Sequence, residues 1–170
     1  MSHPLLYILS GLPGVGKTTL ARLLARDLHA VHLRIDTIEQ ALRDARLPAD
    51  GPEGYLIAYR LAADNLRLGL PVVADSVNPL AITRAAWRTV AAEASVPYVD
   101  IEITCSNPAE HRARVESRAT NVPRLRLPTW DDVRTRAYDA WDSPRLMIDT
   151  AGQTESQSLR QLKLALTASR

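Results

Sequence analysis

The chain has 170 residues, of which 46% are hydrophobic and 24% charged, and its formal net charge is +2 at pH 7. This length fits a single domain, residues 1–170, with a sizeable buried core, and so small a positive surplus does not by itself indicate nucleic-acid binding. The single cysteine, Cys105, excludes an internal disulfide, and the absence of a signal peptide or long apolar stretch predicts a soluble, cytoplasmic protein with no membrane partner.

A phosphate-binding loop is the strongest signal in the sequence. The apolar run Leu5–Leu9 predicts a first strand, and a complete G-x-x-x-x-G-K-[ST] motif follows at residues 11–18. Apolar residues at helical spacing predict a helix at Thr18–Leu28, which completes the strand–loop–helix setting of this motif. A glycine-rich turn with a surface lysine is the alternative. However, only Lys17 and Lys163 among the 21 Lys+Arg residues are lysines, and one of them occupies the position where the motif needs a compact ammonium. The sequence therefore predicts binding of a nucleoside triphosphate.

The chemistry of this loop assigns a role to each part. Its glycines let consecutive backbone N–H groups point at an anion, and the helix that follows adds its free N–H groups. Lys17 is expected to reach the β- and γ-phosphates and Thr18 to bind Mg²⁺, whereas the hydroxyl of Thr19 is expected to cap or pack. The predicted nucleotide-binding residues are Gly11, Leu12, Pro13, Gly14, Val15, Gly16, Lys17, Thr18, Thr19 and, farther along the chain, Arg118.

The rest of the chain alternates between predicted strands and helices. Apolar runs predict strands at Val31–Ile35, Pro71–Asp75, Tyr98–Thr104 and Arg145–Ile148. Helices are predicted at Thr37–Arg46, Glu53–Leu68, Ala81–Ala94, Pro108–Ala119, Asp131–Ala140 and Glu155–Ala168. Residues 120–128 lack periodicity and hold two prolines, so they predict an exposed loop. This alternation predicts an α/β fold with helices on both faces of a five-stranded parallel sheet, and a site at the carboxyl ends of its strands.

Two motifs that the sequence lacks argue against two classes of phosphate-loop protein. It has no Asn-Lys-x-Asp segment of the kind that reads guanine. A water-activating ATPase usually carries two acidic residues after its third strand, but here Asp75 is followed by Ser76. By elimination, the phosphoryl acceptor is expected to be a substrate hydroxyl, which predicts a kinase.

Two aspartates at predicted strand ends are candidates for the chemistry. Asp36 follows the second strand, where an acceptor hydroxyl could lie in line with the γ-phosphate, so it is the candidate general base. The segment from Asp36 to Glu39 also matches a capping box, so capping of the next helix is an alternative that one carboxylate could combine with catalysis. Asp75 is expected to hold Mg²⁺ through water or to order Thr18, with a cap or turn role as its alternative.

An arginine-rich segment follows the fourth predicted strand. On a helix Arg114 and Arg118 share one face, and Arg124 and Arg126 lie in the loop beyond them. Arginines carried by a mobile loop can stabilise the charge of a transferring phosphoryl group, so Arg114 and Arg118 are predicted to be catalytic, Arg118 most of all. The alternative is a solvated, arginine-rich helix face.

Aromatic residues and histidines carry weaker signals. Tyr55 and Tyr59 lie four residues apart on the predicted helix between strands two and three, where an acceptor pocket could form, but packing is the preferred interpretation. The tryptophans are predicted to pack in the core or at a hinge, and the four histidines show no metal-ligand spacing.

The motifs together resemble the small P-loop kinases, whose relatives include polynucleotide kinase, gluconate and shikimate kinases, chloramphenicol phosphotransferase and the zeta toxins. The resemblance is carried by residues 11–18, 33–36, 72–79, 112–118 and 145–150. It implies sheet order 2-3-1-4-5, ATP and Mg²⁺ as cofactors, and an arginine-bearing lid at about residues 112–128. It further implies that the aspartate at position 36 deprotonates the acceptor and that the loop 149–152 lies near the adenine.

One departure from that pattern bears on the acceptor. Polynucleotide kinase typically has an arginine three residues after its base, where this chain has Glu39. An acidic residue there would repel a nucleic-acid phosphate, so the preferred function is an ATP- and Mg²⁺-dependent phosphotransferase acting on a small-molecule hydroxyl. A regulatory nucleotide-binding protein without transfer activity and a 5′-hydroxyl polynucleotide kinase are the alternatives. The sequence names neither the acceptor nor the oligomeric state.

Overall fold

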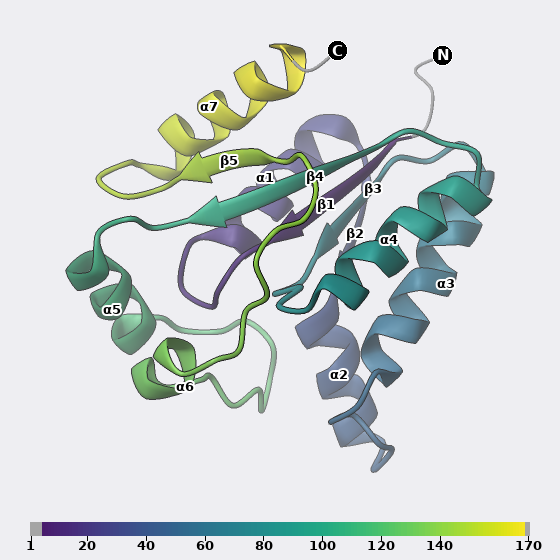
Figure 1. Ribbon diagram of the computed structural model, residues 1–170. Coiled ribbons are helices and arrows are strands. Elements are labelled where there is room, and N and C mark those ends of the chain that lie inside the picture. The colour runs from purple at the N-terminus through teal and green to yellow at the C-terminus, as the bar shows by residue number, and fades with distance from the viewer. Residues whose placement is uncertain (1–4, 169–170) are drawn as a thin grey trace.

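A five-stranded parallel sheet forms the centre of the computed structural model, which describes residues 5–168 (Figure 1). Its strands are Leu6–Ser10 (β1), Val31–Arg34 (β2), Val72–Asp75 (β3), Tyr98–Thr104 (β4) and Leu146–Asp149 (β5). Their order across the sheet is β2-β3-β1-β4-β5, and each neighbouring pair is parallel. The predicted α/β fold and strand order are therefore confirmed.

The helices lie on both faces of this sheet and at its carboxyl edge (Figure 1). They are Lys17–Leu28 (α1), Ile35–Asp44 (α2), Glu53–Arg67 (α3), Ala81–Glu93 (α4), Pro108–Ser117 (α5), Trp130–Arg134 (α6) and Glu155–Ala168 (α7). Except for α6, each predicted helix is present with its ends within about two residues. No helix in the described range 5–168 is long and apolar enough to cross a membrane.

Alternate residues of β1 pack into two hydrophobic cores, one on each face of the sheet. Leu6 and Ile8 pack with residues of α3 and α4, including the fully buried Trp87. Tyr7 and Leu9 face the opposite side, where they pack with α1 and α7. Because both faces are covered, the central strand is apolar throughout instead of alternating, as parallel sheets require. Each fully buried leucine or isoleucine contributes about 1.5–3 kcal/mol, so β1 is held firmly and fixes the start of the phosphate-binding loop.

The predicted helix Asp131–Ala140 is wrong beyond its first turn. A capping box starts α6, but the helix ends at Arg134 because the following residues make tertiary contacts instead. The Asp139 amide donates to the Pro79 carbonyl at 2.7 Å, and the Asp139 carboxylate accepts from the Ala81 amide at 2.8 Å. These contacts tie the segment between α6 and β5 to the start of α4, and they satisfy backbone groups that a longer α6 would have used.

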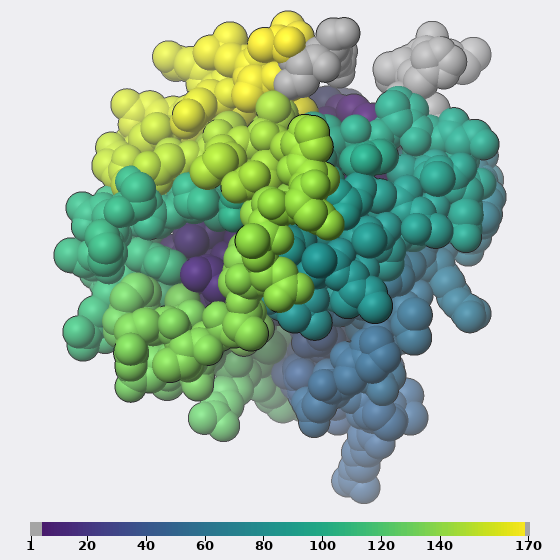
Figure 2. All heavy atoms as spheres, in the orientation of Figure 1, coloured from purple at the N-terminus to yellow at the C-terminus, as the bar shows by residue number. Residues whose placement is uncertain are grey.

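The carboxyl edge of the sheet is hollowed. Figure 2 shows the hollow between α5 and the segment that links α6 to β5, with purple atoms of the phosphate-binding loop visible inside it. Residues just after β1, β2 and β3 line one cavity at this edge, which is where ligands of open α/β sheets bind.

Candidate active site

The phosphate-binding loop has the backbone that its glycines predict. Gly11, Gly14 and Gly16 all have positive φ, at 148°, 87° and 92°. A Cβ at Gly11 would lie 2.3 Å from the Ile103 carbonyl oxygen, and one at Gly14 would lie 2.4 Å from Val115 Cγ2. The loop is therefore pressed between the end of β4 and the helix α5, and side chains at these two glycines would not fit.

Side chains from α5 and from the turn after β5 brace the outside of this loop. His111 Nε2 lies 2.8 Å from the Pro13 carbonyl oxygen, and the Thr150 hydroxyl donates to the Val15 carbonyl at 2.8 Å. Arg114 donates to the Thr150 carbonyl at 2.9 Å and pairs with a carboxylate on its own helix. With their carbonyls held from behind, the loop amides are free to face an anion.

A buried ion pair lies at the inner end of the loop. Lys17 Nζ is 2.8 Å from Asp75 Oδ1, and the Thr18 hydroxyl donates to the same oxygen at 3.3 Å. The second oxygen, Oδ2, lies 3.2 Å from Nε2 of His32. Burial raises the pKa of the Asp75 carboxyl, but the Lys17 ammonium and the hydrogen bonds from its partners outweigh burial and hold the pKa far below its usual value. Asp75 is thus an ionised carboxylate with one oxygen beside the hydroxyl of Thr18.

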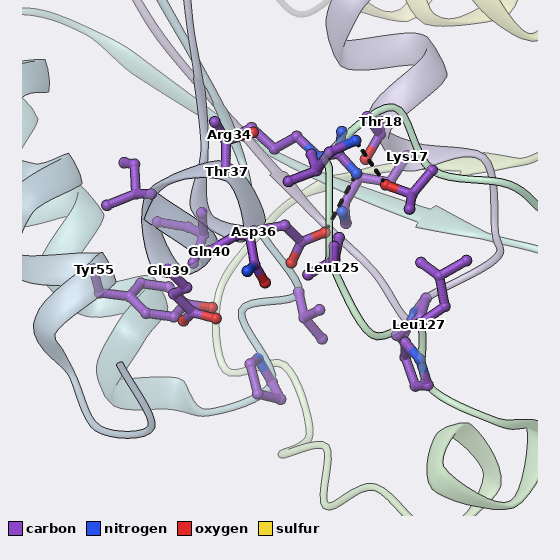
Figure 3. A pocket seen from close by; sticks show the side chains of 18 of the residues that line it. Lys17, Thr18, Arg34, Asp36, Thr37, Glu39, Gln40, Tyr55, Leu125 and Leu127 are labelled. Atoms are coloured by element: carbon purple, nitrogen blue, oxygen red, sulfur yellow. Dashed lines mark hydrogen bonds and ion pairs between the residues drawn. The ribbon is translucent and has the colours of Figure 1, made fainter. Parts of the chain in front are cut away.

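Asp36 lies in the first turn of α2 and not at its cap. The N-cap position of α2 is Arg34, and within residues 5–168 no side chain caps this helix with a hydrogen bond. The capping alternative is therefore not realised. The Asp36 side chain is 46% exposed, and its Oδ2 lies 3.5 Å from an Arg34 nitrogen (Figure 3). A carboxylate that caps nothing and borders the open space is available for proton transfer.

One cavity of about 2000 Å³ joins the phosphate-binding loop to the space above α2 and α3. It exceeds the roughly 300–1000 Å³ of a typical single-ligand pocket, so a nucleotide and an acceptor could share it. Of the predicted site residues, Leu12, Pro13, Gly14, Gly16, Lys17, Thr18, Thr19, Asp36, Arg114 and Arg118 line this cavity. Asp75 lies beneath it, in contact with Lys17 and Thr18.

The far part of the cavity is bordered by Glu39 and Tyr55 (Figure 3). Burial raises the pKa of Glu39, Arg43 opposes that shift and the Asp36 charge adds to it. Burial likewise raises the pKa of Tyr55 to about 12, and its hydroxyl accepts a hydrogen bond from the Asn78 amide at 3.2 Å. Gly54 leaves room for Glu39, because a Cβ there would lie 2.5 Å from the Glu39 Cγ. These partly buried polar groups lie where a second substrate could bind.

The contacts of Tyr59 support the interpretation that this residue packs in the core. Its ring meets Trp87 edge-on with centroids 4.7 Å apart, and its hydroxyl donates to the Thr83 carbonyl at 3.1 Å. Trp130 packs edge-on against His111, with centroids 5.2 Å apart.

The arginines of the predicted cluster lie in four different environments. Arg118 lies at the end of α5 and faces the cavity, whereas Arg114 is held by the turn after β5. Arg112 pairs with Glu116 on the exposed side of α5. Arg124 is 73% exposed and contacts the end of α2, where its NH2 lies 2.7 Å from Asp44 Oδ2. The loop 118–129 thus reaches across the cavity to α2.

Sequence reasoning missed two residues of β2, His32 and Arg34. Both border the cavity, and His32 contacts Asp75. The strand Val31–Arg34 alternates apolar and polar residues, and that alternation places both polar side chains on one face. Since the neighbouring strands β3 and β1 are largely apolar, the alternation in β2 was the available signal.

Known proteins match this chain at three levels. A family model described as an AAA domain matches residues 6–138. A curated relative from Aeropyrum pernix, described as a probable adenylyl-sulfate kinase, is 25% identical over 163 residues, which cover 91% of this chain and 87% of the relative.

Solved structures share the fold at lower identity. The APS kinase of Mycobacterium tuberculosis in complex with AMPPNP and APS has a TM-score of 0.69 at 22% identity, with 98% of this chain and 99% of that chain covered. A gluconokinase from Sinorhizobium meliloti has a TM-score of 0.67 at 12% identity, covering 99% and 94%. These two likenesses establish the fold and no more.

Proposed function

The chain belongs to the AAA-domain family and to its small P-loop kinases, and from that premise we propose that it moves the γ-phosphate of ATP to a hydroxyl group of a small molecule, with Mg²⁺ as cofactor. The observation that carries the proposal is the single cavity that Lys17, Thr18 and Asp36 share. The cavity brings together a triphosphate-binding loop and a carboxylate that is not engaged in capping a helix, and transfer to a hydroxyl requires both.

The nucleotide half of the cavity fits ATP and a divalent cation. The Thr18 hydroxyl and the ionised Asp75 carboxylate converge, and they supply the hard oxygen atoms that Mg²⁺ prefers. When bound, Mg²⁺ supplies positive charge to the phosphate oxygens. Lys17 binds the β- and γ-phosphates, and the loop amides hold the same anion. Among the other predicted residues, Arg118 lines the cavity and is the arginine that we assign to the phosphoryl group, whereas Arg114 holds the turn after β5 that borders the phosphate-binding loop.

Asp36 acts as the general base in this proposal. Its carboxylate takes the proton of the acceptor hydroxyl as the acceptor oxygen forms its bond to the γ-phosphorus, and the bond from that phosphorus to the bridging oxygen of ADP breaks. The products are the phosphorylated acceptor and ADP.

Glu39 supports a small-molecule acceptor over a polynucleotide. It is a partly buried carboxylate in the far part of the cavity, and its side chain is only 21% exposed. A phosphate or sulfate group placed next to it would be repelled. This argument disfavours a 5′-hydroxyl RNA, and it also disfavours adenylyl sulfate, the substrate named for the Aeropyrum pernix relative.

Transfer of label from γ-labelled ATP tests the proposal. The purified protein and its Lys17→Ala variant are each given Mg²⁺ and, in separate reactions, a metabolite extract, adenylyl sulfate or a 5′-hydroxyl RNA oligonucleotide. We expect label on an uncharged small molecule with the wild type alone, because the variant lacks the ammonium that binds the phosphates. Label on the RNA would overturn the choice of acceptor, and no label on any acceptor would overturn transfer itself.

A further inference from the structure

Two guanidinium groups lie close together in the cavity, beside one carboxylate. Arg34 is the last residue of β2, Arg118 directly follows α5, and both line the cavity. Among residues 5–168, Asp36 is the only carboxylate that pairs with Arg34, at 3.5 Å, and none pairs with Arg118. Burial lowers the pKa of Arg118. The negative charge of Asp36 opposes this shift, and the positive charge of Arg34 adds to it. This corner of the cavity therefore holds more positive than negative charge.

The hydrogen-bonding capacity of both arginines is incompletely used. Within the described part of the chain, the buried Nε atoms of Arg34 and Arg118 have no hydrogen-bond partner. Arg34 donates from NH1 to the side chain of Asn121 at 2.9 Å, and Arg118 donates only a long 3.5 Å bond to the Pro128 carbonyl. Buried donors without partners cost free energy, and an anion with several oxygens would satisfy them.

Strand register places Arg34 next to the phosphate-binding loop. Arg34 lies directly opposite Asp75 in the parallel pairing of β2 and β3. Two residues earlier on the same face of β2, His32 contacts Asp75, which in turn contacts Lys17. The Arg34 side chain thus leaves the sheet on the face and at the edge where the phosphate-binding loop ends, and Figure 3 draws its ion pair with Asp36 as a dashed line.

We propose that Arg34 is a further catalytic residue, which together with Arg118 binds the non-bridging oxygens of the γ-phosphoryl group during transfer. The inference rests on the proposed function. Without nucleotide, Arg34 pairs with Asp36; with the phosphoryl group present, its guanidinium binds phosphate oxygens and leaves the Asp36 carboxylate free to take the acceptor proton. The planar, two-pronged guanidinium suits oxygens whose charge increases as the bond to ADP breaks.

The competing explanation is structural: Arg34 could serve only to hold the loop 118–129 through Asn121. The two explanations differ in one measurable respect. A γ-phosphate contact strengthens binding of ATP but not of ADP, whereas a structural tether affects both nucleotides alike.

Nucleotide affinity without acceptor is therefore the first test. Dissociation constants for ADP and for AMPPNP, each with Mg²⁺, are measured by calorimetry on the wild type, Arg34→Gln, Arg34→Lys and Asn121→Ala. We expect Arg34→Gln to weaken AMPPNP binding about tenfold and ADP binding less than about twofold, because charge-assisted hydrogen bonds to the γ-phosphate are lost. Arg34→Lys should fall between, and Asn121→Ala should change neither constant by more than about twofold.

Equal weakening of both nucleotides by Arg34→Gln, or the same AMPPNP loss in Asn121→Ala, would overturn the assignment. Circular dichroism checks the fold of each variant, and if Arg34→Gln does not fold, Arg34→Lys gives the same comparison.

In a turnover assay, the kcat of Arg34→Gln is expected to fall about 10²- to 10³-fold. A rise in acceptor KM alone, with AMPPNP binding unchanged, would assign the anion to the acceptor and contradict the proposal. Since the binding test uses no acceptor, a wild type that binds AMPPNP but phosphorylates nothing would defeat the proposed function, whereas the two dissociation constants would still decide whether Arg34 contacts the γ-phosphate.

Discussion

The two halves of the cavity are built differently. In the nucleotide half, the loop carbonyls are held by His111 and Thr150, and the Lys17–Asp75 pair is buried with its atoms 2.8 Å apart. The ion pairs of the two carboxylates toward the acceptor are long: on the border between the halves Arg34 lies 3.5 Å from Asp36, and in the acceptor half Arg43 lies 3.5 Å from Glu39. The first half is a tightly packed, preorganised site, and the second has polar groups that are free to exchange partners.

This difference separates the donor from the acceptor. A triphosphate always presents the same oxygens, so a rigid loop is the best complement to it. Loosely paired charges can instead rearrange around an acceptor whose shape differs from one kinase to the next. If this comparison holds, changes in one half should leave the binding of the other half's ligand nearly intact.

The largest expected effect comes from the residue on the border between the halves. Asp36→Asn should lower kcat about 10²- to 10⁴-fold, because the amide cannot accept the acceptor proton. ATP affinity should change less than about twofold, since the nucleotide half is untouched. Turnover and nucleotide calorimetry measure the two quantities.

Asp64→Asn is the matched control, because Asp64 is an exposed aspartate on α3 with a 73% exposed side chain. It should leave both quantities unchanged. Transfer at the wild-type rate in Asp36→Asn would show that Asp36 is not the base, and a large loss of ATP binding would break the separation of the halves.

A matched pair of glycines sharpens the claim that the nucleotide half is rigid. Gly14 and Gly69 have nearly equal φ values of 87° and 85°. A Cβ at Gly14 would lie 2.4 Å from Val115 Cγ2, whereas no atom of the described residues lies within 4 Å of one at Gly69. Gly69→Ala should cost about 1 kcal/mol of stability through backbone strain alone and leave ATP binding intact. Gly14→Ala should cost more and weaken ATP binding about tenfold, because the loop must move away from α5. Chemical denaturation and calorimetry test both variants, and equal behaviour of the two would contradict a tightly packed loop.

The same difference explains what the sequence could predict. The phosphate-binding loop was predictable because its backbone follows from glycines and a lysine within eight adjacent residues, and the strand order then followed from the resemblance. The short α6 was not predictable, because contacts of Asp139 with the start of α4, 58 residues away, replace helical hydrogen bonds. Arg34 was missed for a similar reason: only the fold brings the end of β2 to Arg118 and Asn121, 84 and 87 residues later.

A substitution of Glu39 tests whether the acceptor half of the cavity affects the acceptor alone. Glu39→Gln removes a negative charge while keeping the shape of the side chain, so it should change the acceptor KM several-fold and leave the KM for ATP within about twofold. If the acceptor carries no anionic group, the acceptor KM should rise through loss of a charged hydrogen-bond acceptor. A fall in the KM for adenylyl sulfate, or for a phosphate-bearing acceptor, would instead support the repulsion that we assign to Glu39. An equal change in both KM values would break the comparison between the halves.

The smallest expected effect is on stability and concerns the same carboxyl. Burial raises the pKa of Glu39 above its usual 4.5, so the folded protein keeps a proton that the unfolded chain has already lost. The contribution of this group to the free energy of unfolding must therefore fall as pH rises from about 4.5 through the folded-state pKa, by at most about 1.4 kcal/mol per pH unit.

Glu39→Gln should remove that slope, so the stability of the variant relative to the wild type should be higher at pH 7 than at pH 4.5. Since Arg43 offsets part of the burial cost, we expect a total below about 1 kcal/mol. Urea denaturation at both pH values measures it, with the exposed Glu93→Gln as control. A relative stability that does not change with pH would mean that the Glu39 carboxyl is as well solvated in the folded protein as in the unfolded chain, and the acceptor half would then be open to water at this point.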